Sequence, residues 1–350
     1  MGTTLAFVGS RTTRERLARG VGLSVYEVEP DMARWTLRQT IELINPSYLL
    51  VDAVRRTLYA VHGDYSDASS FTIEEDGRLR LLSQRPTRGR NPVHLDASPD
   101  RWHVVVANYA SGSVSALSIG SNGELVEPVA SLQLEGVPGP RHGDQSGSHP
   151  HQVIRWPGTG LFIVPNKGLD RVQVVRLAAN GDLSLAGEAT TAPGAGPRHA
   201  ALDPESGLLW VCNELDSTVT TFRFDPPSAR LVALGTTPLL PPGYHGTSTC
   251  AGIVKRGPSL FVSNRGHDSI VTMKIDARTG LPEPVQWTPT LGTTPRFITL
   301  SPDGTQLLVA NEGSDSIVRH RINSDGLLDV GEVVATTGSP VCIAFVPFQP

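Results

Sequence analysis

One tripeptide pattern, Val-x-Asn at the end of an apolar segment, constrains the fold of this chain more than any other feature. It occurs five times, at Val106–Asn108, Val164–Asn166, Val211–Asn213, Val262–Asn264 and Val309–Asn311. Two degenerate copies, ending at His62 and Ser10, extend the series to seven. Successive copies are 46 to 58 residues apart. Repeats of about 40–50 residues are typical of the blades of β-propellers.

The residues around each copy keep a fixed register. Six residues after each asparagine lies a β-branched residue: Val114, Val172, Val219, Ile270 or Ile317. Sixteen residues before five of the copies lies a proline: Pro46, Pro92, Pro150, Pro197 or Pro295. In the repeat that ends at Asn264 the same offset gives Ser248. We expect each of these positions to begin the first strand of a repeat.

Strand and turn signals fill the repeats. Segments such as 217–224 alternate in polarity and are rich in Thr, Val and Phe, which is typical of half-buried strands. Pairs such as Asn122-Gly123 mark turns. Because no long helical period appears, the sequence predicts an all-β, seven-bladed propeller. We interpret residues 1–350 as a single propeller domain.

The two ends of the sequence predict how the ring closes. The last repeat begins at Pro340 and supplies only a first strand. Segments around Leu5–Val8 and Leu23–Val28 would supply the missing strands. One blade shared by both ends leaves no open sheet edge.

Composition excludes several classes of protein. The chain has 350 residues, 34 acidic and 30 basic, with a formal net charge of −4, so a nucleic-acid partner is not expected. No apolar run approaches the roughly 20 residues of a membrane-spanning helix, and the N-terminal sequence lacks the pattern of a signal peptide. Three cysteines far apart do not indicate a disulfide framework. We expect a cytoplasmic protein without membrane contact; its oligomeric state stays open.

Antiparallel pairing places two sets of residues at one mouth of the central channel. The start of a first strand lies beside the end of the second strand. The residues after the prolines, with Thr249 in the repeat that lacks a proline, are Ser47, Val93, His151, Arg198, Thr249, Arg296 and Val341. The residues after the Asn-type positions are Arg11, Gly63, Tyr109, Lys167, Glu214, Arg265 and Glu312. His149, His199, His245 and His267 lie nearby in sequence.

This mouth is polar in a chain with only 18% charged residues. Arg198, Arg265 and Arg296 are suited to a carboxylate or phosphate, which guanidinium groups bind in a bidentate manner. His151 and Glu214 are candidates for proton transfer. The polar loop 138–148 precedes His151, and we expect that it is able to cover the mouth.

Simpler roles compete with these functional ones. The repeated asparagines are expected to bond turns between strands, and Asp170, Asp216, Asp268 and Asp315 recur where turn or inter-blade contacts are expected. Any single histidine is more often a satisfied polar residue than a catalyst. His149, His151 and His199 are conceivable metal ligands, but no His–carboxylate cluster at one spacing supports a metal site. No Gly-x-Ser-x-Gly nucleophile motif is present.

Six segments between residues 149 and 297 carry a family resemblance. They are His149-Pro-His-Gln-Val153, Gly168-Leu-Asp-Arg-Val172, Gly194-Ala-Gly-Pro-Arg-His199, Asn213-Glu-Leu-Asp-Ser-Thr-Val219, Ser263-Asn-Arg-Gly-His-Asp-Ser-Ile270 and Thr294-Pro-Arg-Phe297. Together they resemble the lactonase family of seven-bladed propellers. That family includes bacterial propeller-type 6-phosphogluconolactonase and fungal 3-carboxy-cis,cis-muconate lactonizing enzyme.

The resemblance implies roles for particular residues. By motif, the catalytic His, Arg and Glu of the family fall on His151, Arg198 and Glu214. Arg265 and Arg296 match anion-binding positions. His149, Lys167, His199 and His267 complete the set of substrate-binding candidates, and the family needs no metal or other cofactor. Two departures are Gly252, where the family commonly has Glu, and Lys167, which adds a positive charge.

The sequence therefore predicts a lactonase that hydrolyses a small anionic sugar lactone similar to 6-phosphogluconolactone. Arginine would stabilise the anion, and His151 and Glu214 would share the acid–base roles in an order that the sequence leaves open. A muconate-type lactonizing cyclase, or a relative repurposed for secondary metabolism, would use the same groups. The sequence also leaves open a non-catalytic binding propeller and a metal-dependent lactone hydrolase.

Overall fold

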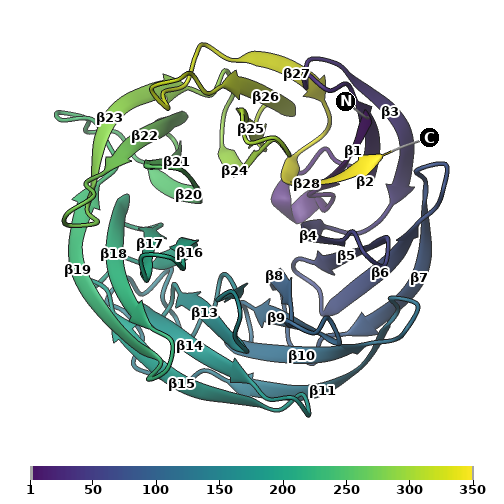
Figure 1. Cartoon of the computed structure of the whole chain (residues 1–350), viewed down its shortest axis with the longest axis horizontal. Helices are drawn as coiled ribbons and strands as arrows, with labels where there is room; N and C mark the ends of the chain where they lie inside the picture. Colours follow the sequence, from purple (N-terminus) through teal and green to yellow (C-terminus); the bar gives the residue numbers. More distant parts are fainter. Residues whose placement is uncertain (1–2, 349–350) are drawn as a thin grey trace.

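Seven four-stranded antiparallel sheets surround a central axis like the blades of a propeller (Figure 1). The computed structural model describes residues 3–348, and among them the only helix is the one-turn 3₁₀ helix Arg14–Arg16. The predicted seven-bladed, all-β architecture is confirmed. We number the blades in chain order and count the blade shared by the two ends as blade 7.

Each blade begins at the axis and ends at the outer rim. Blades 1 to 4 comprise β4 (Pro46–Asp52), β5 (Thr57–His62), β6 (Asp67–Ile73) and β7 (Leu79–Pro86); β8 (Pro92–Ala97), β9 (His103–Asn108), β10 (Ser113–Ile119) and β11 (Leu125–Gln133); β12 (Ile154–Arg155), β13 (Leu161–Asn166), β14 (Arg171–Leu177) and β15 (Leu183–Thr190); and β16 (Pro197–Asp203), β17 (Leu208–Asn213), β18 (Thr218–Asp225) and β19 (Arg230–Pro238). Blades 5 to 7 comprise β20 (Thr249–Arg256), β21 (Ser259–Arg265), β22 (Ser269–Ile275) and β23 (Pro282–Pro289); β24 (Pro295–Leu300), β25 (Gln306–Asn311), β26 (Ser316–Arg321) and β27 (Glu332–Thr336); and β28 (Pro340–Phe348), β1 (Thr3–Ser10), β2 (Gly22–Val28) and β3 (Trp35–Glu42).

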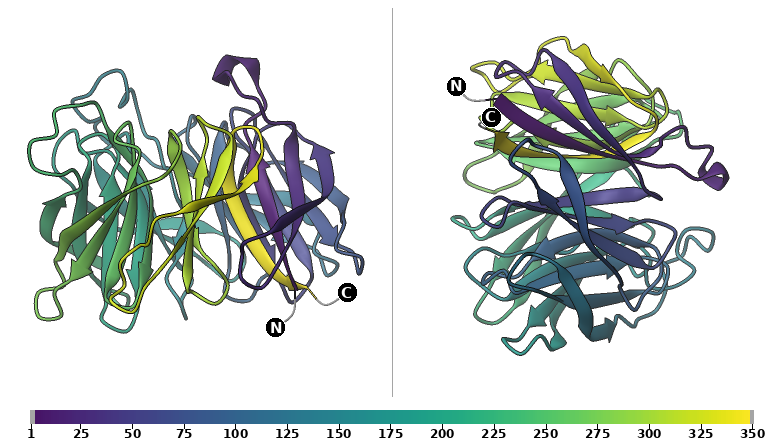
Figure 2. Two further views of the ribbon diagram at one scale, coloured as in Figure 1. Left: turned by 90° about the horizontal axis from the view of Figure 1, so that it is seen from above. Right: turned by 90° about the vertical axis from the view of Figure 1, so that its right-hand side faces the viewer.

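Blade 7 closes the ring as predicted. Its innermost strand β28 pairs antiparallel with β1, from Thr3 opposite Phe348 to Ser10 opposite Pro340. The start of β1 and the end of β28 lie together on one face of the disk, and the 3₁₀ helix projects from the opposite face (Figure 2). The helix therefore marks the face that carries the predicted mouth, because it follows Arg11 at the end of β1.

Apolar side chains pack between neighbouring blades. In one such layer, Trp156 and Val174 of blade 3 pack with Phe222 of blade 4, and each is at most 3% exposed. Burial of this kind is the main favourable contribution to folding. The three cysteines are free and buried.

A β-bulge recurs at the residue that follows the proline in five blades. The pairing skips one residue there, as between Pro197 opposite Asn213 and His199 opposite Cys212. The skipped residues are Ser47, Val93, Arg198, Arg296 and Val341. A bulge redirects its side chain out of the regular alternation. This explains how the predicted mouth positions face the channel.

Blade 5 corrects the predicted register. Cys250, rather than Ser248, pairs with Asn264, so Ala251 takes the mouth position that the sequence assigned to Thr249. The reason is a shorter hairpin: Arg256 pairs with Ser259 across a two-residue turn, whereas the corresponding strands of blade 4 are joined by four residues between Asp203 and Leu208.

Blade 3 requires a second correction. Pro150 forms only an isolated bridge with Asn166, and β12 is limited to Ile154–Arg155, so this proline does not begin a continuous strand. Two polar groups of this segment bond to neighbouring blades. The side chain of Gln152 accepts a 2.7 Å hydrogen bond from the Ala200 amide, and the Arg155 amide donates to Asp96 at 2.9 Å.

The recurring Asn and Asp residues hold turns and inter-blade segments. Asn213 donates to Thr218 and Thr220 of the next strand at 2.8 and 2.9 Å. The Asp170 carboxylate accepts hydrogen bonds from the amides of Gly194 and Gly196, at 2.6 and 2.8 Å, in the segment that enters blade 4. Gly196 has a φ of +67°, and a Cβ there would lie 2.6 Å from Leu215.

Four aromatic side chains from different blades meet near the axis below the mouth. Tyr48 and His94 have ring centroids 3.8 Å apart, His94 and His199 are 5.7 Å apart, and Phe297 lies 6.0 Å from Tyr48. We call these four residues the aromatic floor. Burial and Arg198 lower the pKa of His94 from its usual value to about 3. His94 is therefore neutral near pH 7.

Candidate active site

A cavity of about 320 Å³ opens at the mouth above the aromatic floor. Its lining comprises the basic residues Arg11, Arg16, Lys167, Arg265 and Arg296, the acidic residues Asp144 and Glu214, and Asn91, Val93, Tyr109 and His151. A second cavity of about 20 Å³ lies deeper and is lined in part by His151, Arg198 and His199. His151 faces both cavities. The volume of the larger one lies within the range of small-molecule sites.

Glu214 is the centre of the deeper part of the mouth. It follows the last residue of β17, and its amide donates to the Gly196 carbonyl at 2.7 Å. Lys167 Nζ lies 2.8 Å from Glu214 Oε1, and Arg198 Nε and Arg265 Nη2 lie 2.8 and 3.3 Å from Oε2. Asp144 of the loop 138–148 lies 3.1 Å from Lys167. We call these five residues the Glu214 cluster.

Contacts within this cluster determine the protonation states of Glu214 and Lys167. Burial alone would raise the pKa of the Glu214 carboxyl, but Arg265, Arg198 and Lys167 together hold it well below its usual range. Burial opposes the charge on Lys167, yet Glu214 and Tyr109 raise the pKa of this ammonium group. Glu214 is therefore a fixed anion and Lys167 a fixed cation near neutral pH.

Backbone carbonyls of blade 5 position the two arginines. Arg198 Nη1 donates to the Ala251 carbonyl at 2.6 Å, and Arg265 Nη2 donates to the Cys250 carbonyl at 3.0 Å. Both acceptors lie at the start of the irregular pairing in β20. Burial lowers the pKa of Arg198 to about 10, so its guanidinium stays charged. Two oriented cations thus remain beside the Glu214 carboxylate.

His151 is a partly buried, neutral imidazole. Burial and then Arg198 lower its pKa well below the usual value of 6.5. Its Nδ1 has no hydrogen-bond partner among the described residues. Tyr109 lies edge-on to the ring with centroids 5.5 Å apart. A neutral imidazole with a free nitrogen can accept a proton.

The residues predicted for the site fall into three groups. Arg198, Glu214, Lys167, Arg265, Arg296 and His151 all lie around the two cavities. His199 belongs to the aromatic floor and lines only the deeper cavity. His149 and His267 line neither cavity: His149 stacks on Tyr109, and His267 contacts Ser269 and Tyr244.

Arg16, Asn91 and Asp144 line the large cavity but were not predicted from the sequence. Arg16 and Asp144 come from connections between strands that have no counterpart in the repeat. Asn91 directly precedes the proline of its repeat, one position outside the predicted mouth set. Arg11 was among the predicted mouth positions but not among the selected site residues. The only signal for Arg16 was the long connection between β1 and β2, which adds a loop at the mouth.

Neither a metal-binding group nor a membrane-spanning helix is found between residues 3 and 348. No three or more His, Cys, Asp or Glu side chains in that range are grouped to hold a metal ion. No helix in the same range has the length and apolarity needed to cross a membrane.

The chain is similar to known proteins over almost its whole length. The family model described as "Lactonase, 7-bladed beta-propeller" matches residues 5–345. A 6-phosphogluconolactonase of Bacillus subtilis is 26% identical over 97% of this chain and 98% of its own length.

Two solved structures extend the similarity to the fold. A periplasmic gluconolactonase of Pseudomonas aeruginosa is 29% identical, with a TM-score of 0.87 over 99% of this chain and all of its own. A protein from Lactobacillus plantarum is 25% identical, with a TM-score of 0.90 over 98% of this chain and 99% of its own. With the family model matched nearly from end to end, this chain belongs to the lactonase family of seven-bladed β-propellers.

Proposed function

We propose that this protein hydrolyses a small anionic sugar lactone of the 6-phosphogluconolactone type. One observation carries the proposal: a buried carboxylate that contacts three cations and a neutral, partly buried histidine line the same cavity of about 320 Å³. The relatives named as 6-phosphogluconolactonase and gluconolactonase support the same class of reaction.

Lactone hydrolysis needs a base for water and a positive site for the oxyanion. Water adds to the ring carbonyl, the ring C–O bond then breaks, and one water and one lactone give one hydroxy acid. The carbonyl oxygen carries negative charge in between. Oriented cations in a water-poor site stabilise such a charge without reorganising. Arg198 and Arg265, held by Glu214 and by two carbonyls, supply that arrangement.

We assign the proton transfers to His151 rather than to Glu214. Glu214 contacts three cations, which depress its proton affinity. His151 is uncharged and faces both cavities. It would take a proton from the attacking water and return it to the ring oxygen as the C–O bond breaks. Glu214 would keep Lys167, Arg198 and Arg265 in place.

Hydrolysis of freshly prepared 6-phosphoglucono-δ-lactone tests the proposal. The wild-type rate, the rate of Glu214→Gln and the uncatalysed background would be compared, with Glu205→Gln as the control because Glu205 is an exposed turn residue. We expect a wild-type rate above background, retained in the control and after chelation, and lost in Glu214→Gln. A folded wild-type protein with no rate above background would contradict the proposal. A rate lost on chelation and restored by a divalent cation would instead indicate a metal-dependent hydrolase.

A further inference from the structure

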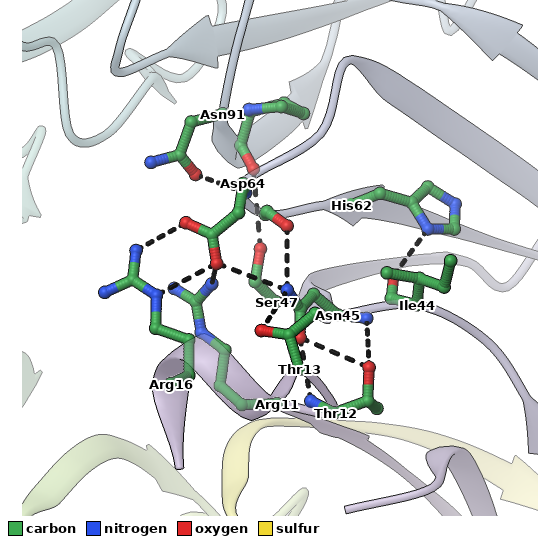
Figure 3. A network of polar contacts seen from close by, with 12 residues as sticks. Arg11, Thr12, Thr13, Arg16, Ile44, Asn45, Ser47, His62, Asp64 and Asn91 are labelled. Carbon is green, nitrogen blue, oxygen red and sulfur yellow. Dashed lines mark hydrogen bonds and ion pairs between the residues drawn. The ribbon is translucent and has the colours of Figure 1, made fainter. Parts of the chain in front are cut away.

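A second charged cluster lies at the rim of the mouth, on the side of blades 7 and 1. The Asp64 carboxylate accepts hydrogen bonds from Arg16 Nε at 2.9 Å, from Arg16 Nη2, and from Arg11 Nη1 at 3.1 Å (Figure 3). Asn45 donates to the same carboxylate at 3.2 Å, and Asn91 accepts from the Asp64 amide at 2.7 Å. We call these five residues the Asp64 cluster.

The backbone of Asp64 is fixed in place by its conformation and by a hydrogen bond. Its φ of +69° is uncommon for a residue other than glycine, and its amide is tied to Asn91. Burial would raise the pKa of its carboxyl, but Arg16 and Arg11 lower it below the usual value. A fixed carboxylate that contacts two guanidiniums determines where their remaining N–H groups point.

Arg11 and Arg16 each have N–H groups that are not bonded to Asp64. Arg11 is 4% exposed, yet only its Nη1 has a side-chain partner, and its buried Nε has none among the described residues. Arg16 uses Nε and Nη2 on Asp64. Both side chains line the large cavity together with Arg296. Burial and Arg296 lower the pKa of Arg11 to about 10, so Arg11 stays charged near neutral pH.

The charge of the whole mouth does not balance. The Glu214 and Asp64 clusters, with the Arg296–Glu312 pair at 3.3 Å, bring six basic side chains together with four acidic ones. This excess of two positive charges arises in a chain whose net charge is −4. A phosphate monoester carries about −1.5 to −2 charges near pH 7 and accepts bidentate bonds from arginine.

We propose that Arg11 and Arg16 bind the phosphate of a phosphorylated sugar lactone, while Asp64 positions both guanidiniums. The inference deepens the proposed function and rests on it: the reacting carbonyl lies at the Glu214 cluster and the phosphate at the Asp64 cluster. Arg296 lines the same cavity as residues of both clusters. The substrate class is therefore a phosphorylated lactone rather than an unsubstituted one.

The competing explanation is a structural clip. In that case the Arg16–Asp64 contact only pins the connection between β1 and β2, and breaking it from either side has the same result. A phosphate subsite predicts unequal results. Arg16→Gln removes a ligand of the phosphate, whereas Asp64→Asn keeps both arginines and a side-chain oxygen that can still accept from them, and removes a negative charge that repels the phosphate.

Calorimetric titration of 6-phosphogluconate and of gluconate distinguishes the two. We expect Arg16→Gln to weaken 6-phosphogluconate binding about tenfold or more, the effect of losing a charge-assisted hydrogen bond, and to change gluconate binding much less. Asp64→Asn should weaken 6-phosphogluconate binding much less than Arg16→Gln does. Arg14→Gln is the matched control, because Arg14 is an exposed residue of the same 3₁₀ helix.

An equal loss in Arg16→Gln and Asp64→Asn, for both ligands and with a matching fall in Tm, would overturn the subsite in favour of the clip. The titration needs no turnover. Phosphate-selective binding without lactone hydrolysis would refute the proposed function and leave the subsite. Hydrolysis by the wild type with the same preference for 6-phosphoglucono-δ-lactone over glucono-δ-lactone in Arg16→Gln would refute the subsite alone.

Discussion

The Glu214 and Asp64 clusters are built from the same kinds of groups but differ in burial. In each, a single carboxylate contacts more than one cation. The Glu214 side chain is 11% exposed and its three cations between 4% and 14%, whereas Asp64 is 25% and Arg16 42% exposed. Glu214 follows the end of a strand, while Asp64 occupies a turn with positive φ beside the long connection between β1 and β2.

The difference teaches how one mouth can separate two tasks. Electrostatic interactions are stronger where water is excluded, so the deep cluster is suited to stabilising charge that develops during a reaction. In the Asp64 cluster Arg11 is buried, but Arg16 and Asp64 keep contact with solvent, so their ion pair is weaker. This cluster is suited to recognising a charge that the substrate carries permanently. Under this interpretation chemistry belongs to the deep cluster and selection to the rim.

We expect the largest effect from a substitution that disrupts the Glu214 cluster. Glu214→Gln should lower kcat/KM for 6-phosphoglucono-δ-lactone by about a thousandfold, since Arg198, Arg265 and Lys167 lose the group that orients them. Arg16→Gln, at the rim, should cost only about tenfold. Steady-state kinetics of both variants measure the contrast. Comparable losses would show that the two clusters do not differ in role.

The next effect concerns proton transfer at the deep cluster. His151→Gln should lower kcat/KM about a hundredfold. In the wild type His151 accepts a proton only when neutral, and burial and Arg198 hold its pKa well below 6.5. Activity should therefore be constant from about pH 7.5 down to about pH 6 and fall only at lower pH. A pH–rate profile corrected for background tests this. A midpoint at or above 6.5 would contradict the assignment of His151 as base.

A third prediction concerns His94 in the aromatic floor, below the Glu214 cluster. The pKa of His94 is about 3 in the folded protein, against a usual value of 6.5. The unfolded chain therefore binds a proton that the folded chain does not, and stability falls as pH falls below 6.5. From about pH 7.5 to about pH 5 this residue accounts for a loss of about 2 kcal/mol in the free energy of unfolding.

Urea unfolding at the two pH values measures that loss. His94→Phe should remove about 2 kcal/mol from the pH dependence. His142→Gln, at an exposed histidine of the loop 138–148, should leave the pH dependence unchanged. If the free energy of unfolding of His94→Phe depended on pH as strongly as that of the wild type, the pKa of His94 would not be lowered in the folded protein.

The smallest expected effect sharpens the comparison at the rim. Arg16→Gln should change the free energy of unfolding by less than about 1 kcal/mol, because an exposed ion pair contributes little. Urea unfolding near neutral pH measures it. A loss of several kcal/mol would move the Asp64 cluster from recognition to structural support.

The repeat made most of the fold predictable. A proline before the bulge in five blades and an asparagine near the end of the second strand in five blades keep one register through most of the ring. That register also brought His151, Arg198 and Glu214 to one mouth. The two-residue turn after Arg256 shifted blade 5 because a hairpin can lose two residues without changing its strand pattern. Arg16 escaped prediction because connections between strands have no periodicity. That Glu214 contacts cations from three other strands depends on three-dimensional packing.

The pairing of β28 with β1 also affects the residues at the mouth, where β1 ends and β28 begins. Where these strands reach the mouth, the Arg11 amide donates to the Ser339 carbonyl at 3.0 Å, and Ser10 pairs with Pro340. The strand pairing that closes the ring thus also holds the backbone of Arg11, one of the arginines that line the cavity. Separating β28 from β1 would therefore also displace a residue that lines the cavity.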